Sequence, residues 1–124
     1  MKDIHDYEIK RYSMDFVTNE LVFKIEKNNN FKKIIFYKVF AYHFSDEMAY
    51  SVILDLEERN LDHFFKMNKK LLNDRKNYGW PIMYEDNDEL RKKIEESHAN
   101  YYLMRSSYGM GGWILAESVE IIDS

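Results

Sequence analysis

Apolar and polar residues alternate through the first half of the chain. The alternation at residues 12–16, and again at 21–26, is typical of strands with one buried face. The asparagines at 28–30 predict a tight turn after the second strand, because asparagine tolerates left-handed backbone angles. A nearly continuous β-branched and aromatic run at 33–44 predicts a central strand, and the alternation at 50–56 predicts a fourth.

The period of the pattern changes after residue 60. Apolar residues at 61–72 recur at helical spacing, which predicts an amphipathic helix. Asn60 is placed to cap its first turn, where Asp62 adds a negative charge that the helix dipole favours. We expect His63 and the lysines of this segment to lie on the solvated face of the helix.

A second helix is predicted further along the chain. The glycine and proline within residues 79–81 predict the end of the first helical segment. The next helix is expected at 87–98, where Asp86 suits the N-cap and Glu89 completes an acidic capping box. Its apolar side is narrow, so we expect it to lie at an edge of the domain.

The last part of the chain returns to the strand pattern. Strands are predicted at 101–105 and 113–121, and the glycine-rich connection at 106–112 predicts a turn or bulge with positive φ angles. The predicted order is therefore β-β-β-β-α-α-β-β. This segregation indicates a single α+β domain over residues 1–124, with an antiparallel sheet of about six strands and two helices packed on one face.

Composition narrows the class of protein. With 45% hydrophobic residues, a chain of 124 residues can remove roughly two thirds of its unfolded surface from water. The net charge of −4 disfavours nucleic acid as a partner, because phosphate binding needs a cationic footprint. The absence of cysteine excludes disulfides and thiol chemistry. No signal peptide or membrane-spanning stretch is visible, so we expect a cytoplasmic protein outside the membrane.

The chain shows no catalytic or cofactor signature. The four histidines are not spaced as metal ligands, although His5 beside Asp6 forms one neighbouring pair. The glycines at 109–112 precede strand-like residues rather than a helix, so they do not predict a phosphate loop. We therefore expect no catalytic residue, no metal and no cofactor. Two alternatives stay open: a small-ligand or nucleic-acid-binding domain, and a small enzyme without a recognisable motif.

Aromatic residues, 16% of the chain, are its most unusual feature. Tyrosine and tryptophan combine a large apolar area with a polar tip and are typical anchors of protein interfaces. Those in the loop between the predicted helices and at the predicted hairpin are the hardest to bury, and an acidic cluster follows that loop. The candidate partner-binding residues are Tyr78, Trp80, Tyr84, Glu85, Asp86, Asp88, Glu89 and Tyr108. Alternatively, the aromatics fold back onto the core and the acidic residues form a solvated helix start.

Two segments resemble known families. The opening Ile4-His5-Asp6-Tyr7-Glu8-Ile9 resembles the start of small bacterial immunity-type families, which are encoded beside polymorphic toxins. The stretch from Ser106 to Ala116 is similar to the final hairpin of small Firmicutes-type proteins. The resemblance implies an inhibitory protein with a toxin domain as its partner. We therefore predict a protein-binding module, and the sequence leaves homo-oligomer formation open.

Overall fold

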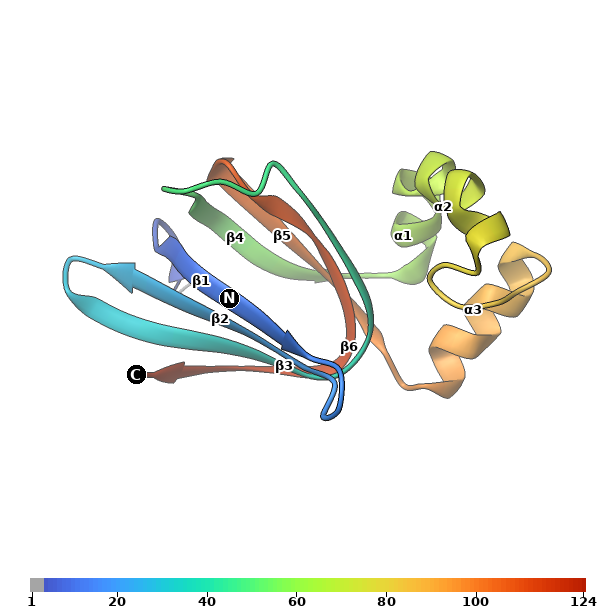
Figure 1. Ribbon diagram of the computed structural model, residues 1–124, viewed down its shortest axis with the longest axis horizontal. Coiled ribbons are helices and arrows are strands. Elements are labelled where there is room, and N and C mark those ends of the chain that lie inside the picture. The colour runs from blue at the N-terminus through green and yellow to red at the C-terminus, as the bar shows by residue number, and fades with distance from the viewer. Residues whose placement is uncertain (1–3) are drawn as a thin grey trace.

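The chain folds into six antiparallel strands and a group of helices (Figure 1). This computed structural model describes residues 4–124. The strands are β1 (Glu8–Asp15), β2 (Glu20–Lys27), β3 (Asn30–Ser45), β4 (Val52–Arg59), β5 (Asn100–Tyr108) and β6 (Gly111–Asp123). Between β4 and β5 lie α1 (Leu61–Met67), α2 (Lys69–Arg75), the 3-10 turn η2 (Lys76–Tyr78) and α3 (Asn87–Glu96). The predicted α+β class is confirmed, although the helical segment contains three α-helices rather than two.

The sheet closes on itself in the order β1-β2-β3-β6-β5-β4. The closure between β1 and β4 is short, because their register contains only the pair of Glu8 with Val52. A backbone hydrogen bond of 2.8 Å from Ile9 N to Ser51 O supports this corner. By contrast, β3 and β6 pair along almost their whole length, from Lys32 with Asp123 to Ser45 with Gly111.

Backbone angles explain a turn and a bend in this sheet. Asn28 and Asn29 have φ angles of 50° and 64°, as a two-residue type I′ hairpin requires, so the predicted turn is confirmed. Lys38 has a φ of 51°, and the register of β3 against β6 shifts between Val39 and Ala41. Such a bulge bends a strand, and Figure 1 shows β3 and β6 turning sharply at the helical end of the barrel.

The barrel interior is filled by aliphatic and aromatic side chains. Leu21, Phe23 and Ile25 are all buried, as their alternation predicts. The ring of Phe23 lies 5.4 Å from that of Tyr12 and 5.5 Å from that of Phe44. Burying one such large side chain contributes roughly 1.5–3 kcal/mol, so this core is the main source of barrel stability.

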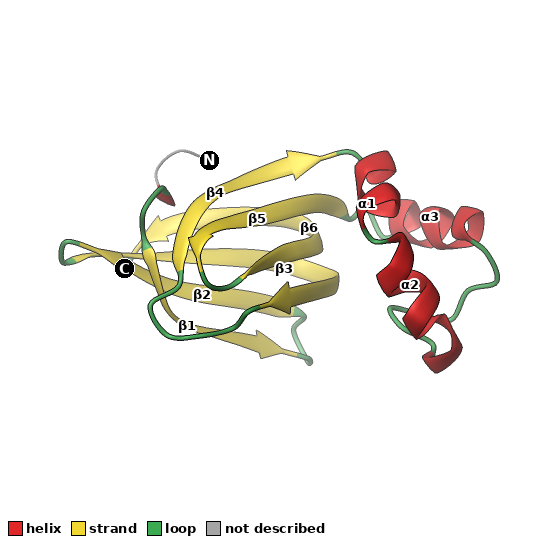
Figure 2. Cartoon of the chain, turned by 90° about the horizontal axis from the view of Figure 1, so that it is seen from above, coloured by secondary structure: helices red, strands yellow, loops and turns green. Residues whose placement is uncertain are grey.

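A second core joins the helices to the outer side of the sheet. The helices stand at one end of the barrel (Figure 2), and their buried residues cluster with residues of β3, β5 and β6. The ring of Phe64 in α1 lies 5.0 Å from that of Trp113 and 5.3 Å from that of Tyr101. A hydrogen bond also links the helices to β6, because Asn68 Oδ1 accepts a 2.9 Å hydrogen bond from the Trp113 indole.

Both predicted helix caps are confirmed. The Oδ1 of Asn60 accepts a 2.9 Å hydrogen bond from the backbone N–H of His63. The Oδ1 of Asp86 accepts one of the same length from the backbone N–H of Glu89. In a complete capping box the Glu89 carboxylate would accept a hydrogen bond from the backbone N–H of Asp86. It pairs with Lys93 at 3.2 Å instead, one turn along α3.

Several local predictions are wrong. The helix expected at 61–72 is interrupted at Asn68, whose φ of −113° separates α1 from α2. In β4 the buried residues are Ile53 and Leu56 instead of an alternating set, because register shifts beside Ile53 change the face of the residues that follow. His63 is half-buried rather than solvated. Of the three glycines at 109–112, only Gly109 has a positive φ, and the other two lie in β6.

Candidate protein-binding groove

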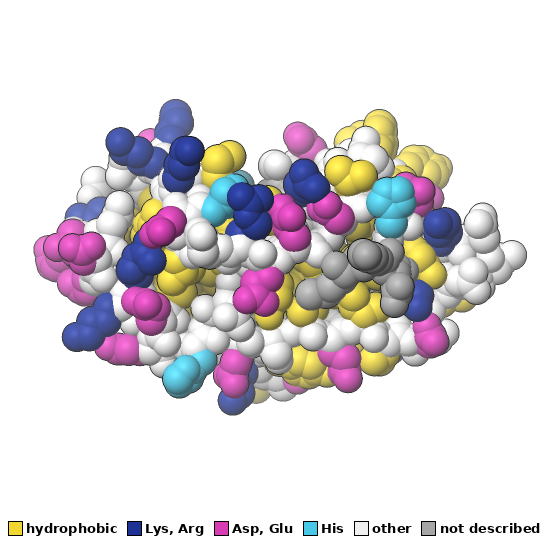
Figure 3. Space-filling model, turned by 180° about the vertical axis from the view of Figure 1, so that it is seen from behind, with side chains coloured by type: hydrophobic (Ala, Val, Ile, Leu, Met, Phe, Trp, Pro, Cys, Tyr) yellow, Lys and Arg dark blue, Asp and Glu magenta, His cyan; other side chains and the backbone are white. Residues whose placement is uncertain are grey.

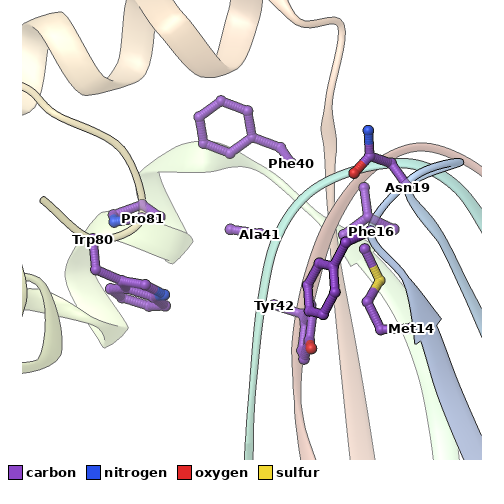
Figure 4. A pocket seen from close by; sticks show the side chains of 9 residues that line it. Met14, Phe16, Asn19, Phe40, Ala41, Tyr42, Trp80 and Pro81 are labelled. Atoms are coloured by element: carbon purple, nitrogen blue, oxygen red, sulfur yellow. The ribbon is translucent and has the colours of Figure 1, made fainter.

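A groove of about 350 Å³ lies at the boundary between the barrel and the helices. Four segments that are distant in sequence line it: the end of β1, the β1–β2 turn, the bend of β3, and the loop before α3. Figure 4 shows Phe16, Met14 and Tyr42 gathered on one side and Trp80 with Pro81 on the other. The lining residues are Met14, Phe16, Asn19, Val39, Phe40, Ala41, Tyr42, Trp80 and Pro81.

The walls of the groove belong to two different cores. Met14 and Tyr42 pack against the barrel core, whereas Phe40 and Trp80 pack against the helix cluster. All four side chains are half-buried, so one side of each is held by the protein and the other is open. A side chain fixed in this way loses little conformational entropy when a partner covers it.

Large apolar side chains extend beyond the groove on both sides. In the β1–β2 turn, Phe16 is 77% exposed and Val17 is 91% exposed. In the loop before α3, Met83 is 72% exposed, and Ile82 is exposed as well. Large apolar side chains exposed next to a groove are typical of interaction sites, because they are costly to leave in water.

Hydrogen bonds hold the turn that presents the exposed phenylalanine. The Asp15 carboxylate accepts hydrogen bonds from the backbone N–H groups of Thr18 and Val17, at 3.1 and 2.8 Å. These bonds lower the pKa of Asp15 below its usual value, because they favour the charged form. The carbonyl of Asn19 accepts a 2.9 Å hydrogen bond from Val39 N, which fixes the turn against β3.

Contacts also hold the opposite wall. The Arg75 guanidinium lies 5.2 Å from the centre of the Trp80 ring, in a cation–π arrangement. The Trp80 ring is 6.0 Å from that of Trp113, which is itself buried in the helix cluster. The ammonium of Lys93 donates a 2.6 Å hydrogen bond to the carbonyl of Met83. The loop is therefore anchored to both the barrel and α3.

The structure separates the partner-binding residues predicted from the sequence. Trp80 lines the groove, and Tyr78 is 86% exposed at the start of the same loop. Tyr84 is half-buried against the helix cluster, as the folded-back alternative expects. Tyr108 ends β5, at a distance from the helices (Figure 2). The acidic members Glu85, Asp86, Asp88 and Glu89 lie in the loop before α3 and in its first turn.

Sequence reasoning missed most of the groove. The alternation predicts Phe16 on the buried face of a strand, but β1 ends one residue earlier. Phe40 and Tyr42 sit in the run expected to be a fully buried central strand, yet both are half-buried. The pairing of β3 with β2 ends at Phe36, so the rest of β3 has one edge without β2. The local sequence pattern does not indicate this change.

The helices carry charges of both signs on the face shown in Figure 3. Lys and Arg side chains (dark blue) gather over the α1–α2 end, with Asp and Glu (magenta) beside them. Lys70, for example, pairs with Asp74 at 2.7 Å. This end of the molecule therefore presents a mixed charge pattern.

A second cavity, of about 370 Å³, lies between α1 and the outer side of β4, β5 and β6. Arg59 pairs there with Glu57 at 3.1 Å, and Arg105 forms a two-point ion pair with Asp55. The Arg105 guanidinium lowers the pKa of the Asp55 carboxyl. The buried Nδ1 of His63 has no hydrogen-bond partner within the described chain. Since both arginines already have carboxylate partners, this cavity has no unneutralised guanidinium for an anion.

The remaining ionisable groups are scattered. His5 Nδ1 lies 3.1 Å from an Asp6 carboxylate oxygen, and both side chains are more than half exposed, at 55% and 53%. His43 stacks 6.3 Å from Trp113, and burial, followed by the charge of Arg75, lowers its pKa. Within residues 4–124, no three His, Asp or Glu side chains are grouped closely enough to hold a metal ion.

Comparison with known proteins gives no match: no family model, no curated protein and no solved structure matches the chain. No helix within residues 4–124 is long and apolar enough to cross a membrane.

Proposed function

We propose that this protein is a non-catalytic module that binds a protein partner in the groove between its barrel and its helices. One observation carries the proposal: half-buried side chains from two cores line the groove, and its rim leaves Phe16, Val17 and Met83 at least 72% exposed. Removing such apolar area from water is the main driving force of association. Aromatic side chains that are fixed by packing are typical hot spots of protein interfaces.

The extent of this surface favours a protein over a small molecule. A small ligand that fills about 350 Å³ would leave the exposed rim residues in water. A protein surface covers the groove and the rim together, which matches the usual arrangement of an apolar interface centre.

A toxin domain is the class of partner that we propose first, with inhibition by occlusion of its active site. The resemblance of residues 4–9 to immunity-type families supports this choice. The net charge of −4 also supports it, because opposite charges accelerate the association of an acidic inhibitor with a basic toxin. The proposed compartment is the cytoplasm.

Co-expression with the product of the neighbouring gene tests the toxin assignment. We expect a stable complex that survives purification, and loss of toxin activity on titration with this protein. Neighbouring genes without a toxin domain, or a toxin that keeps its activity, would reject the immunity role and leave the binding module to be tested by variants of the groove.

A matched pair of variants tests the groove itself. Phe16→Asp places a charge at the rim, and we expect it to weaken partner binding at least about 30-fold, as for an interface centre worth about 2 kcal/mol. Phe31 is 51% exposed at the β2–β3 hairpin, at the far end of the barrel (Figure 1), so Phe31→Asp is the control. We expect less than about a twofold effect there. Equal affinities of the two variants, both folded, would exclude the groove as the interface.

A further inference from the structure

One edge of β1 has no neighbouring strand over most of its length. β1 pairs with β2 from Glu8 to Asp15, but its register with β4 contains only the pair at Glu8. In the described chain, the edge from Lys10 to Asp15 therefore faces no strand. Unpaired backbone N–H and C=O groups on such an edge are a ready template for another strand.

The register identifies which backbone groups face outward. A two-residue hairpin turn is flanked by a hydrogen-bonded pair, so Lys27 and its alternate neighbours in β2 bond to β3. The other residues of β2 bond to β1, and their partners there include Arg11 and Ser13. It follows that the N–H and C=O groups of Tyr12 and Met14 point to the open edge.

This open edge lies beside the groove. The side chain of Met14 lines the groove, and the ring of Tyr12 lies 5.6 Å from that of Phe44 near the end of β3. The last part of β3 pairs with β6 on one side, whereas its pairing with β2 ends at Phe36. An extended segment laid along β1 would therefore place alternate side chains toward Met14 and Tyr42, on an apolar floor.

Two carboxylates beside Tyr12 favour a basic residue at that point of the partner. The Glu47 carboxylate accepts a hydrogen bond of 2.5 Å from the Tyr12 hydroxyl, so it lies beside β1. Asp46 precedes it in the same exposed loop, and neither carboxylate forms an ion pair within the described chain. A lysine or arginine in the partner would offset part of this negative charge and strengthen association at low salt.

We propose that the occupant of the groove is an extended segment of a partner protein, which adds to β1 as an edge strand. Its backbone pairs with Tyr12 and Met14, its alternate apolar side chains enter the groove, and a Lys or Arg lies next to Glu47. Six residues match the open edge from Lys10 to Asp15, over roughly 20 Å. This inference rests on the proposed function and specifies how the partner binds.

A displayed library of random peptides, each about ten residues long, tests this binding mode on the full chain. We expect the enriched peptides to alternate apolar and polar positions and to carry a basic residue. Binding of a synthetic enriched peptide is expected to slow amide hydrogen exchange of Tyr12 and Met14 at least about tenfold, because each N–H gains a partner. Glu47→Gln is expected to weaken binding a few-fold and to reduce its salt dependence.

Proline provides the sharper variant. Met14→Pro removes an N–H that faces the open edge, a position that edge strands tolerate, whereas Met14→Ala removes only the side chain. We expect the proline variant to bind the peptide about fivefold to tenfold more weakly than the alanine variant. Ser13→Pro removes a bond to β2 and is expected to destabilise the fold instead.

Three results would overturn this inference. In the first, peptides bind in the groove with no protection at Tyr12 and Met14; the binding module then stands but the strand does not. In the second, protection appears without peptide as protein concentration rises, so the occupant is a second copy of this chain. In the third, no peptide is enriched; Phe16→Asp then decides separately whether the groove binds a folded surface. Exchange data stay decisive if Met14→Pro fails to fold.

Discussion

The hydrogen bond between Asn68 and Trp113 allows a quantitative test of how the helices are attached to the barrel. Trp113 is 4% exposed, and its indole N–H donates to Asn68 Oδ1 at 2.9 Å. The Nδ2 of Asn68 donates to the carbonyl of Phe64 at 2.9 Å, across the break between α1 and α2. One side chain therefore satisfies groups from two elements.

Asn68→Ala removes both of these bonds. A buried indole N–H without a partner costs about 1–3 kcal/mol. Loss of the hydrogen bond from Asn68 Nδ2 to the Phe64 carbonyl costs about 0.5–1.5 kcal/mol more. We expect the free energy of unfolding to fall by about 2–4 kcal/mol, a large part of the 5–15 kcal/mol typical of a domain. Urea unfolding followed by tryptophan fluorescence measures this change. Asn73→Ala, on the exposed side of α2, is the control and is expected to change it by less than about 0.5 kcal/mol.

A double-mutant cycle separates the hydrogen bond from packing. Trp113→Phe removes the indole N–H, so the loss caused by Asn68→Ala is expected to be about 1–2 kcal/mol smaller in that background. An additive cycle, with no coupling between the two positions, would refute the role of this hydrogen bond. Because the Trp80 ring rests 6.0 Å from that of Trp113, we also expect Asn68→Ala to weaken binding in the groove.

Other consequences of the structure are equally open to measurement. Burial, and then the hydrogen bond to Glu47, raise the pKa of Tyr12 to about 12 from its usual 10.0. The neutral hydroxyl therefore stabilises the fold fully up to about pH 10. We expect this contribution to be lost as the pH rises to about 12. A pKa near 10 in an NMR titration of the Tyr12 ring would contradict this. Tyr12→Phe should remove that part of the pH dependence of the free energy of unfolding. Gly112→Ala is expected to prevent stable folding, because its Cβ would lie 2.0 Å from the backbone carbonyl of His43; normal expression and thermal unfolding of this variant would disprove the close approach. Asp86→Ala removes the N-cap of α3 and is expected to cost about 1 kcal/mol, whereas Asp86→Asn should keep most of that stability in the same unfolding assay.

Local chemistry predicted the type and order of most elements of this protein. The alternation at Leu21, Phe23 and Ile25 predicted one buried face, because the side-chain period of a strand depends only on its own backbone. Asn60 and Asp86 predicted two helix starts for the same reason, since a cap bonds to an N–H three residues away. The α+β class follows from the order of these elements.

Only the tertiary structure decided closure, bulges and the groove. β3 pairs with β2 only up to Phe36 and bends at the bulge after Lys38, and nothing in the local pattern of residues 33–44 marks either change. Phe16 and Trp80 are distant in sequence and come together only because the barrel brings the β1–β2 turn beside the helical loop. The tertiary structure also left the edge of β1 without a neighbouring strand. Strand neighbours are set by packing between distant segments, so they lie beyond the reach of local periodicity.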